Sequence, residues 1–267
     1  MILVVNADDA GIDPARNRGI LEAARRGVVR SASVLVGFPA AAALAREAAG
    51  ALGLGLHLNL TEGTPLVAGH RTLAGADGRF HGKRELWRRA RAGALDLREA
   101  GREIEAQWEA LRRLAGEPTH LDGHNHVHLF PGVAEAVAAA IGAGTWVRRP
   151  MPRPGRLPED LYADLEEGLG RLSARVGAIW GRRFRHVDRF VGPDLPEGYG
   201  SADLVGVLAG EHGTVEVMTH PGATDPGSVP FSARPERAAE VAALCDRRLL
   251  DWVRAEDVQL SSFGDLA

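Results

Sequence analysis

The stretch "MILVVNADDAGIDPARNRGILEAARRG" (residues 1–27) determines the fold class. Its apolar start predicts a buried strand over residues 2–6, because a short apolar run bounded by polar residues is typical of such strands. A helix follows, with Asp13 as N-cap, Pro14 at the first helical position and Gly27 at the end. A buried strand joined to a capped helix is the repeating unit of a parallel α/β sheet.

The same alternation continues along the chain. It predicts strands over residues 31–36, 54–60, 119–124, 145–149, 213–220 and 258–263, with a weaker strand over 184–190. Helices are predicted over residues 40–50, 83–94, 97–115, 131–144, 159–178, 201–210 and 233–255. Seven or eight parallel strands in this length predict one (β/α) barrel domain over residues 1–267, closed or nearly closed. An open doubly wound sheet is the alternative.

Composition limits the functional classes. The 267 residues are 45% hydrophobic and 25% charged, which is typical of a globular protein, and the net charge of -3 argues against nucleic-acid binding. No apolar run approaches the ~18 residues of a membrane span. Cys245, the only cysteine, lies at helical spacing with Val241 and is predicted to be core. With no signal peptide visible, the sequence predicts a cytoplasmic protein and leaves homodimer formation open.

Polar residues collect where the predicted strands end. They are Asp8 and Asp9 (first strand), His57 and Asn59 (third), Asp122, His124, His126 and His128 (fourth), Arg148 (fifth) and His220 (residues 213–220). Parallel α/β folds build their sites at these strand ends, so the residues are predicted to share one rim. A single histidine near a strand end is more often structural, and "HNHVH" alone is a weak metal signal. The convergence of five strand ends is the stronger argument.

The adjacent carboxylates of Asp8 and Asp9 need an explanation, because a regular strand points neighbouring side chains to opposite faces. A divalent cation would neutralise one carboxylate. One aspartate and two histidines leave positions open for water and substrate, and such an ion lowers the pKa of water and polarises a carbonyl. The second carboxylate could then accept a proton. Two imidazoles favour zinc, while availability can favour magnesium.

The sequence argues against a dinucleotide-binding site and against a catalytic serine. The glycine-rich "GALGLG" (residues 50–55) is followed by a strand and lacks the third glycine of a dinucleotide site. No serine stands in the context of a nucleophile elbow.

Several motifs together resemble the YdjC-like carbohydrate deacetylases, the family that includes chitooligosaccharide and hopanoid-biosynthesis deacetylases. They are "VNADDAG" (5–11), "GLHLNLTEGTPL" (55–66), "PTHLDGHNHVHLFP" (118–131) and "VEVMTHPG" (215–222). Ala10 replaces the usual aromatic residue and is expected to widen the pocket. The resemblance implies a deformed (β/α) barrel, one divalent metal ion (Zn²⁺ or Mg²⁺) and hydrolysis of an N-acetyl group on a sugar.

The resemblance also implies roles for individual residues. Asp9, His57 and His124 would bind the metal, and Asp8 would be the general base. His220 would either contact the substrate or donate a proton to the leaving group. Asn59, Asp122, His126 and His128 would line the pocket or support its residues. Arg148 would either anchor an acidic substrate group or pair with an acidic residue of the rim.

The sequence therefore predicts a metal-dependent hydrolase that releases acetate from an N-acetylated amino sugar or oligosaccharide. Two alternatives remain open at this point. The first is another metallohydrolase with the same ligands, such as a phosphoesterase or a cyclic-amide hydrolase. The second is a non-catalytic sugar-binding protein with a metal, against which the second carboxylate, Asp8, is an argument.

Overall fold

The computed structural model describes residues 1–150, 169–225, 227, 229–231 and 233–266. Its strands are β1 (Ile2–Ala10), β2 (Ser31–Val34), β3 (Gly53–Leu58), β4 (His120–Gly123), β5 (Trp146–Val147), β6 (Arg189–Val191), β7 (Thr214–Thr219) and β8 (Gln259–Leu260). Its helices are α1 (Pro14–Arg26), α2 (Ala41–Glu47), α3 (Lys83–Arg91), α4 (Leu97–Ala115), α5 (Val133–Ala140), α6 (Leu169–Trp180), α7 (Ser201–Leu208), α8 (Pro235–Leu244) and α9 (Arg247–Ala255). A 3₁₀ helix, η1 (His124–Leu129), follows β4, and another, η3 (Phe263–Asp265), follows β8.

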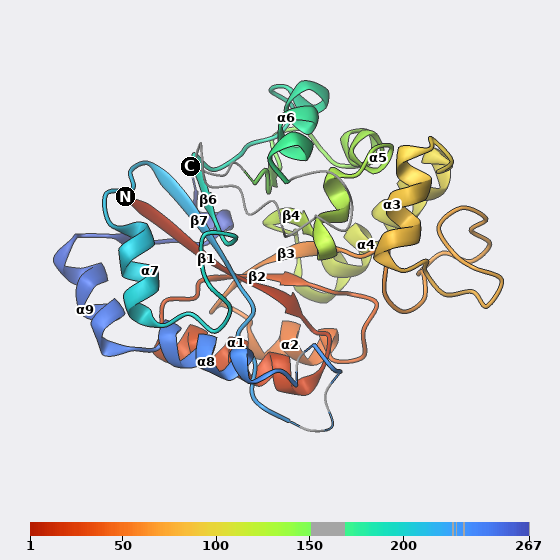
Figure 1. Ribbon diagram of the computed structural model, residues 1–267. Coiled ribbons are helices and arrows are strands. Elements are labelled where there is room, and N and C mark those ends of the chain that lie inside the picture. The colour runs from red at the N-terminus through yellow and green to blue at the C-terminus, as the bar shows by residue number, and fades with distance from the viewer. Residues whose placement is uncertain (151–168, 226, 228, 232, 267) are drawn as a thin grey trace.

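The strands form one curled parallel sheet surrounded by helices (Figure 1). Their order is β5-β4-β3-β2-β1-β7-β6, and β8 pairs with the first residues of β1. A single parallel bridge between Trp146 and Arg185 links β5 to the segment just before β6. The sheet is therefore nearly closed, which confirms the predicted deformed barrel. Because β1 lies between β2 and β7, its carboxyl end is central to the rim.

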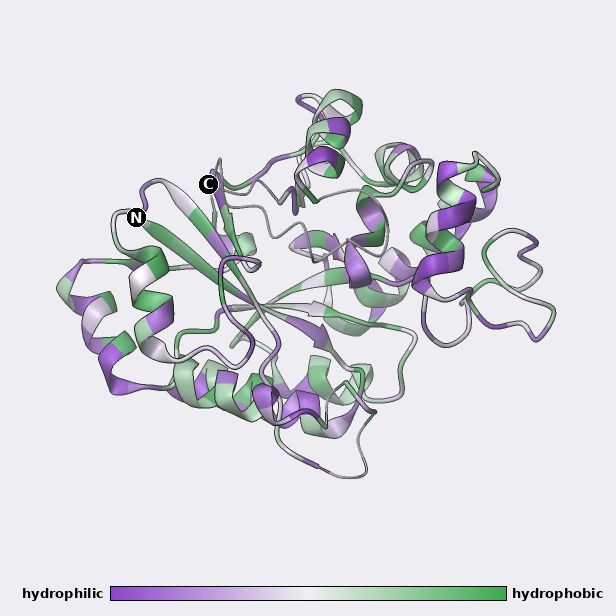
Figure 2. Cartoon of the chain, in the orientation of Figure 1, coloured by the Kyte–Doolittle hydropathy of each residue, from purple (hydrophilic) through white to green (hydrophobic). Residues whose placement is uncertain are grey.

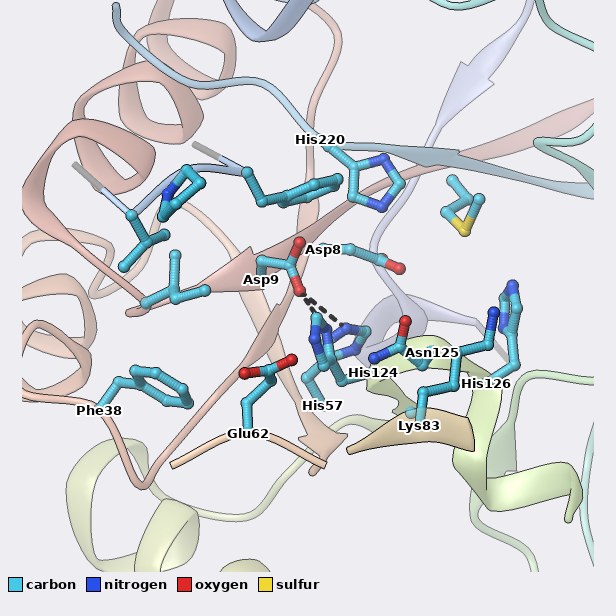
Figure 3. Close-up of a pocket in the computed structure, with 16 residues that line it drawn as sticks. Asp8, Asp9, Phe38, His57, Glu62, Lys83, His124, Asn125, His126 and His220 are labelled. Carbon is cyan, nitrogen blue, oxygen red and sulfur yellow. Dashed lines mark hydrogen bonds and ion pairs between the residues drawn. The ribbon is translucent and has the colours of Figure 1, made fainter. Parts of the chain in front are cut away.

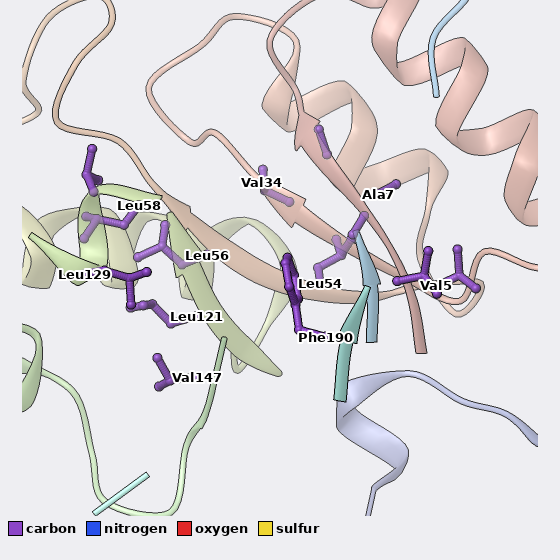
Figure 4. Close-up of a cluster of buried hydrophobic side chains, with 14 of the residues drawn as sticks. Val5, Ala7, Val34, Leu54, Leu56, Leu58, Leu121, Leu129, Val147 and Phe190 are labelled. Atoms are coloured by element: carbon purple, nitrogen blue, oxygen red, sulfur yellow. The ribbon is translucent and has the colours of Figure 1, made fainter. Parts of the chain in front are cut away.

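The core explains why these segments fold as they do. Residues 3–10 of β1 are all buried, and Val5, Leu56, Leu121 and Phe190 contribute to the main hydrophobic cluster (Figure 4). Several outer helices are amphipathic, with hydrophilic residues on the surface (Figure 2). The buried ring of His120 lies over Gly55, where any Cβ would come within about 2.3 Å of it. The interior between β3 and β4 is thus packed around a glycine.

The ends of the predicted elements differ from the structure in several places. β1 continues to Ala10, whereas the predicted strand stopped at residue 6. The helix predicted over 233–255 is two helices, because Asp246 caps α9 by accepting a hydrogen bond from the Arg248 backbone N–H at 2.7 Å. Cys245, at this break, is half-buried and packs against the main hydrophobic cluster, so it lies at the edge of the predicted core. The first part of the helix predicted over 159–178 lies outside the described residues.

The long connection between β3 and α3, residues 59–82, is fixed by one face of α4. Glu103 accepts hydrogen bonds from the backbone N–H groups of Leu66 and Val67, both at 3.0 Å. Glu99 accepts from the next part of the loop, at residues 71 and 72. Gln107 exchanges hydrogen bonds with the backbone of Asn59, at 3.0 and 2.7 Å. We call these three buried residues of α4, spaced four apart, the α4 polar stripe.

Among the described residues, no helix combines the length and apolar character needed to cross a bilayer.

Candidate active site

A cavity of about 610 Å³ opens at the carboxyl ends of the strands. The predicted residues that line it are Asp8, Asp9, His57, His124, His126 and His220 (Figure 3). The other predicted residues, Asn59, Asp122, His128 and Arg148, are buried nearby and do not line it. Ala10 is fully buried in the core and is not among the residues that line the cavity. The structure therefore brings the strand-end residues together: six of them line the cavity, and four are buried nearby.

A bulge at the end of β1 lets two adjacent carboxylates face the same region. The register of β1 against β2 shifts between Ala7 and Ala10. Asp9 has a φ of 61°, in the left-handed region that non-glycine residues adopt rarely. This backbone turn breaks the alternation of a regular strand, so Asp8 and Asp9 both reach the cavity.

Asp9 meets two histidines from different strands. Its Oδ1 lies 2.8 Å from His124 Nδ1 and 3.2 Å from His57 Nε2. The three ligand atoms lie within 4.8 Å of one another, as a shared ion would require. The two imidazoles keep the pKa of Asp9 well below its usual value, although burial alone would raise it. The cluster thus offers one ionised carboxylate and two ring nitrogens.

Asp122 sets the orientation of His57. His57 Nδ1 donates to Asp122 Oδ1 at 2.7 Å, which leaves Nε2 facing Asp9. A metal-binding histidine commonly has its other ring nitrogen held by a carboxylate in this way. Burial alone lowers the pKa of His57, but Asp122, Asp8 and the hydrogen bond to Asp9 outweigh it and raise the pKa to about 10. His57 therefore carries a proton at neutral pH in the protein described here.

Asp8 makes a different set of contacts. Arg148 donates to both of its oxygens, at 2.6 Å to Oδ2 and 2.8 Å to Oδ1. Asn6 donates to Oδ1 at 2.8 Å. Among the described residues, Oδ2 accepts only the bond from Arg148, so a lone pair remains for a group in the cavity. Asp8 is therefore held in place beside the cluster of Asp9, His57 and His124. Its carboxylate also lies within 4.8 Å of ligand atoms of His57 and Asp122, which form a second group that could hold an ion.

Arg148 is completely buried and bonds to three carboxylates. Besides Asp8, it contacts Asp122 Oδ2 at 2.8 Å and Glu216 Oε1 at 2.7 Å. Burial raises the pKa of Glu216 to about 7, against the opposing charge of Arg148. Of the two roles considered for Arg148, the structure supports pairing with acidic residues. Its side chain does not reach the cavity to anchor a substrate.

The turn after β4 separates the histidines of "HNHVH". Asn125 and His126 have φ values of 54° and 50°, so the backbone is kinked within η1. His124 and His126 line the cavity, whereas His128 points away and donates from Nε2 to the backbone oxygen of Arg148 at 3.0 Å. Burial lowers the pKa of His128 to about 3. His128 thus supports the loop that carries Arg148.

His220 lies at the end of β7, which pairs in parallel with β1. Its backbone N–H donates to Glu240 at 2.5 Å, and its backbone oxygen accepts from Arg16. The ring meets that of Phe231 edge-on, with centroids 5.6 Å apart. Burial is the main cause that lowers the pKa of His220. The backbone contacts hold the ring at the cavity.

The sequence patterns missed several polar residues beneath the cavity. Ser33 donates to Asp122 Oδ2 at 2.7 Å and lies 3.0 Å from the ring of His120. Glu216 and Asn6 also belong to this buried network. A signal was available for Asn6 and Glu216, each of which is a polar residue within an apolar run, in "LVVNA" and "VEV". Since buried polar groups need partners, such positions point to a network inside the barrel.

Comparisons with known proteins find similar sequences and a similar fold. A family model for YdjC-like proteins matches residues 2–255. A carbohydrate deacetylase of Homo sapiens is 36% identical over an alignment of 298 positions, which covers 100% of this chain and 91% of that protein. A chitooligosaccharide deacetylase of Enterobacter sp. (strain 638) is 34% identical over 99% of both chains. A crystal structure from Enterococcus faecalis V583 has a TM-score of 0.75 at 24% identity, with 99% and 98% coverage, and so shares the fold.

Proposed function

The chain belongs to the YdjC-like protein family, and from this premise we propose that it is a metal-dependent carbohydrate N-deacetylase. It would hydrolyse the N-acetyl group of an amino sugar or oligosaccharide and release acetate. One observation carries the proposal: the cluster of Asp9, His57 and His124 lies in a cavity beside a separate carboxylate, Asp8.

The residues of the cluster fit a divalent metal. One carboxylate and two imidazoles form a common three-ligand set that leaves coordination positions open. His57 already has its second nitrogen held by Asp122 at 2.7 Å. When bound, the ion would polarise the acetamide carbonyl and lower the pKa of a water molecule. Zinc and magnesium both remain candidates, since imidazoles suit zinc and carboxylates suit magnesium.

The chain's own residues divide the remaining work. Asp8, held by Arg148, would accept the proton of the attacking water through its available Oδ2 lone pair. His220, directly after β7, the strand beside β1, would donate a hydrogen bond to the leaving nitrogen, and that nitrogen would take up the proton that Asp8 accepted from water, so that the C–N bond breaks to give acetate and a free amine. An imidazole can donate this hydrogen bond because at least one ring nitrogen carries a hydrogen in either protonation state. Arg148, Asp122 and Ser33 would keep these groups in fixed orientations.

The substrate class rests on the relatives and the cavity. The two relatives described above are named for carbohydrate and chitooligosaccharide deacetylation. The cavity volume lies within the usual range for small-molecule sites. Phe38 and Phe231 also line the cavity and offer apolar faces of the kind that sugar rings pack against.

Acetate release tests the proposal directly. The protein is stripped with a chelator, reloaded with Zn²⁺ or Mg²⁺, and given N-acetylglucosamine and its β-1,4-linked dimer and trimer. We expect acetate only after reloading, and none from the Asp9→Asn variant. Phosphate release from phosphate esters without acetate release would favour another metallohydrolase. Sugar binding without turnover by the reloaded protein would favour a binding protein.

A further inference from the structure

The basic residues of this chain are almost all arginines. The sequence holds 31 arginines and a single lysine, Lys83. Lys83 begins α3, a nine-residue helix that also contains four arginines. Lys83 lines the candidate active-site cavity, and none of these four arginines does. The one lysine therefore occupies a position with a different environment from the arginines around it.

The position of Lys83 at the cavity allows its ammonium group to contact a bound ligand. Lys83 projects toward the side of the cavity where Asn125 and His126 lie (Figure 3). An ammonium is compact, has three donors and sits on a flexible stem, whereas a guanidinium is a wide planar fork. A sugar presents hydroxyl and ring oxygens at several angles. A rotatable three-donor group suits such oxygens better than a planar fork.

A second charged residue belongs to the same wall. Glu62 lines the cavity and is placed by Asn59, whose side-chain oxygen accepts the Glu62 backbone N–H at 3.0 Å and whose amide donates to the Glu62 backbone oxygen at 2.8 Å. The backbone N–H of Phe80 donates to Gly63 at 3.0 Å, which ties the segment before Lys83 to the residue after Glu62. The α4 polar stripe then fixes the rest of this loop. Lys83 and Glu62 are therefore parts of one constructed wall.

We propose that Lys83 and Glu62 form the sugar-recognition wall of the active site and determine substrate affinity. Lys83 donates hydrogen bonds to oxygens of the amino sugar, and Glu62 accepts hydrogen bonds from its hydroxyl groups. The inference rests on the proposed deacetylase function and adds residues that contact the sugar away from the scissile amide.

Kinetics of matched variants test the role of Lys83. For N,N′-diacetylchitobiose, Lys83→Met should raise KM by about 10- to 100-fold, the range for a lost charge-assisted hydrogen bond. The value of kcat should stay within about threefold, because this contact is made equally before and during the reaction. Lys83→Arg should recover part of the affinity. Arg84→Met, the exposed neighbour, should match the wild type. An unchanged KM in Lys83→Met, or a loss confined to kcat, would overturn the proposal.

The single lysine also permits a readout without turnover. Reductive ¹³C-methylation should label only Lys83 and the N-terminal amine, giving two separate groups of NMR signals. In the Asp8→Asn variant, adding N,N′-diacetylchitobiose should shift the Lys83 signal and leave the N-terminal signal in place. Glu62→Gln should weaken this binding, since an amide is a poorer acceptor than a carboxylate. A Lys83 signal that does not move at saturating sugar would contradict the proposal.

These outcomes separate the two ideas. A wild-type protein that releases no acetate from any N-acetylated sugar refutes the deacetylase function. An active wild type whose Lys83→Met variant keeps the same KM refutes only the recognition wall. Thermal unfolding of each variant identifies a change caused by loss of folded protein.

Discussion

The bulge at Asp9 gives two identical side chains different environments. Asp9 turns into the left-handed region and meets two imidazoles, while Asp8 stays within reach of Arg148 and Asn6. A backbone conformation of this kind costs of order 1–3 kcal/mol and tends to persist at functional sites. The adjacent aspartates can therefore act as metal ligand and proton acceptor within one short turn.

Exchanging the two carboxylates for amides should separate their roles. Asp9→Asn should lose the metal and with it all deacetylation. Asp8→Asn should keep the metal and lose about 10²- to 10⁴-fold in turnover, the usual contribution of a general base. Metal content and acetate release, measured on the same samples, check this. If Asp8→Asn empties the site and Asp9→Asn does not, the two roles have been assigned in reverse.

Metal binding should release a proton from His57. With its pKa raised to about 10, mainly by Asp122 and Asp8 against the effect of burial, His57 is protonated at pH 8 in the metal-free protein. A metal ligand must be deprotonated. Calorimetry in buffers of different ionisation enthalpy should therefore show about one proton released per ion at pH 8. Asp122→Asn should reduce this release; the absence of any release in the wild type would contradict the assignment of His57.

For individual residues, the sequence predicted which side chains meet at the site, but not which of them bond to one another. Asp9, His57 and His124 lie at or just after the carboxyl ends of buried strands, so their meeting could be expected. Arg148 also follows a strand, and nothing in "WVRRP" shows that its side chain turns inward to Glu216. The three-dimensional path of a long side chain depends on neighbours from other strands, which a linear pattern does not contain.

The α4 polar stripe shows how one helix can organise a distant loop. Glu99, Glu103 and Gln107 lie on one face of α4 at intervals of four residues, and all are buried. They bond to loop backbone groups in place of apolar side chains. The wall that carries Glu62 is thus held by an element outside the sheet.

Removing the middle of the stripe should loosen the loop. Glu103→Ala would leave the part-buried backbone donors of Leu66 and Val67 without their acceptor. The cost is at most about 1–3 kcal/mol for each donor, because water reaches this loop. We expect a lower free energy of unfolding and faster proteolysis within residues 59–82. Urea unfolding and limited proteolysis measure the two effects. The exposed Glu105→Ala serves as the matched control on the same helix, and equal behaviour of both variants would exclude a role for the stripe.

Element types were easier to predict than element ends. Pro14 and Asp13 mark the start of α1, and the structure confirms both, with Asp13 accepting from the Arg16 backbone at 2.8 Å. The break between α8 and α9 was missed because the hydrophobic period continues through it. Asp246 is a good N-cap in the middle of that pattern, and its local hydrogen bond competes with a continuous helix.

The whole molecule should be most stable near neutral pH when it holds no metal. Burial lowers the pKa of His120 to about 4 and that of His128 to about 3, against 6.5 when unfolded. Below pH 6.5 the unfolded chain binds more protons, so the free energy of unfolding falls as the pH falls. Glu216 has the opposite effect, because burial raises its pKa to about 7 and the folded protein then binds its proton more tightly than the unfolded chain between about pH 4.5 and 7. This one group stabilises the fold as the pH falls, whereas the two histidines destabilise it. Above pH 6.5, His57 holds a proton that the unfolded chain has lost, so stability falls again toward pH 10.

Urea unfolding with a chelator at pH 5, 7 and 9 checks this expectation. His120→Gln should flatten the acid side, where His120 alone contributes on the order of 3 kcal/mol between pH 6.5 and 4. His212→Gln, at an exposed histidine, should leave the profile unchanged. A stability that rises steadily from pH 7 to 9 in the metal-free protein would be inconsistent with the protonation of His57.

The barrel itself could be predicted because its signal is distributed over the whole chain. Repeated alternation of strands and helices predicts a parallel sheet, even where the end of a single strand or helix is predicted at the wrong residue. The near-closure between β5 and β6 could not be predicted, since it depends on one bridge, between Trp146 and Arg185. The segment "FRHVDRF" carries it, and only its last two residues, Arg189 and Phe190, belong to the regular strand β6.

The place of β1 between β2 and β7 also affects how the protein is made. The ribosome releases β1 roughly 200 residues before β7, a delay of about 10 to 40 seconds at ordinary translation rates. During that time one edge of an apolar strand has no partner from its own chain, and unpaired edges recruit strands from other molecules. Nascent chains therefore pass through a period when they are prone to aggregate and are suitable clients for chaperones. A premature stop before residue 214 would make that state permanent.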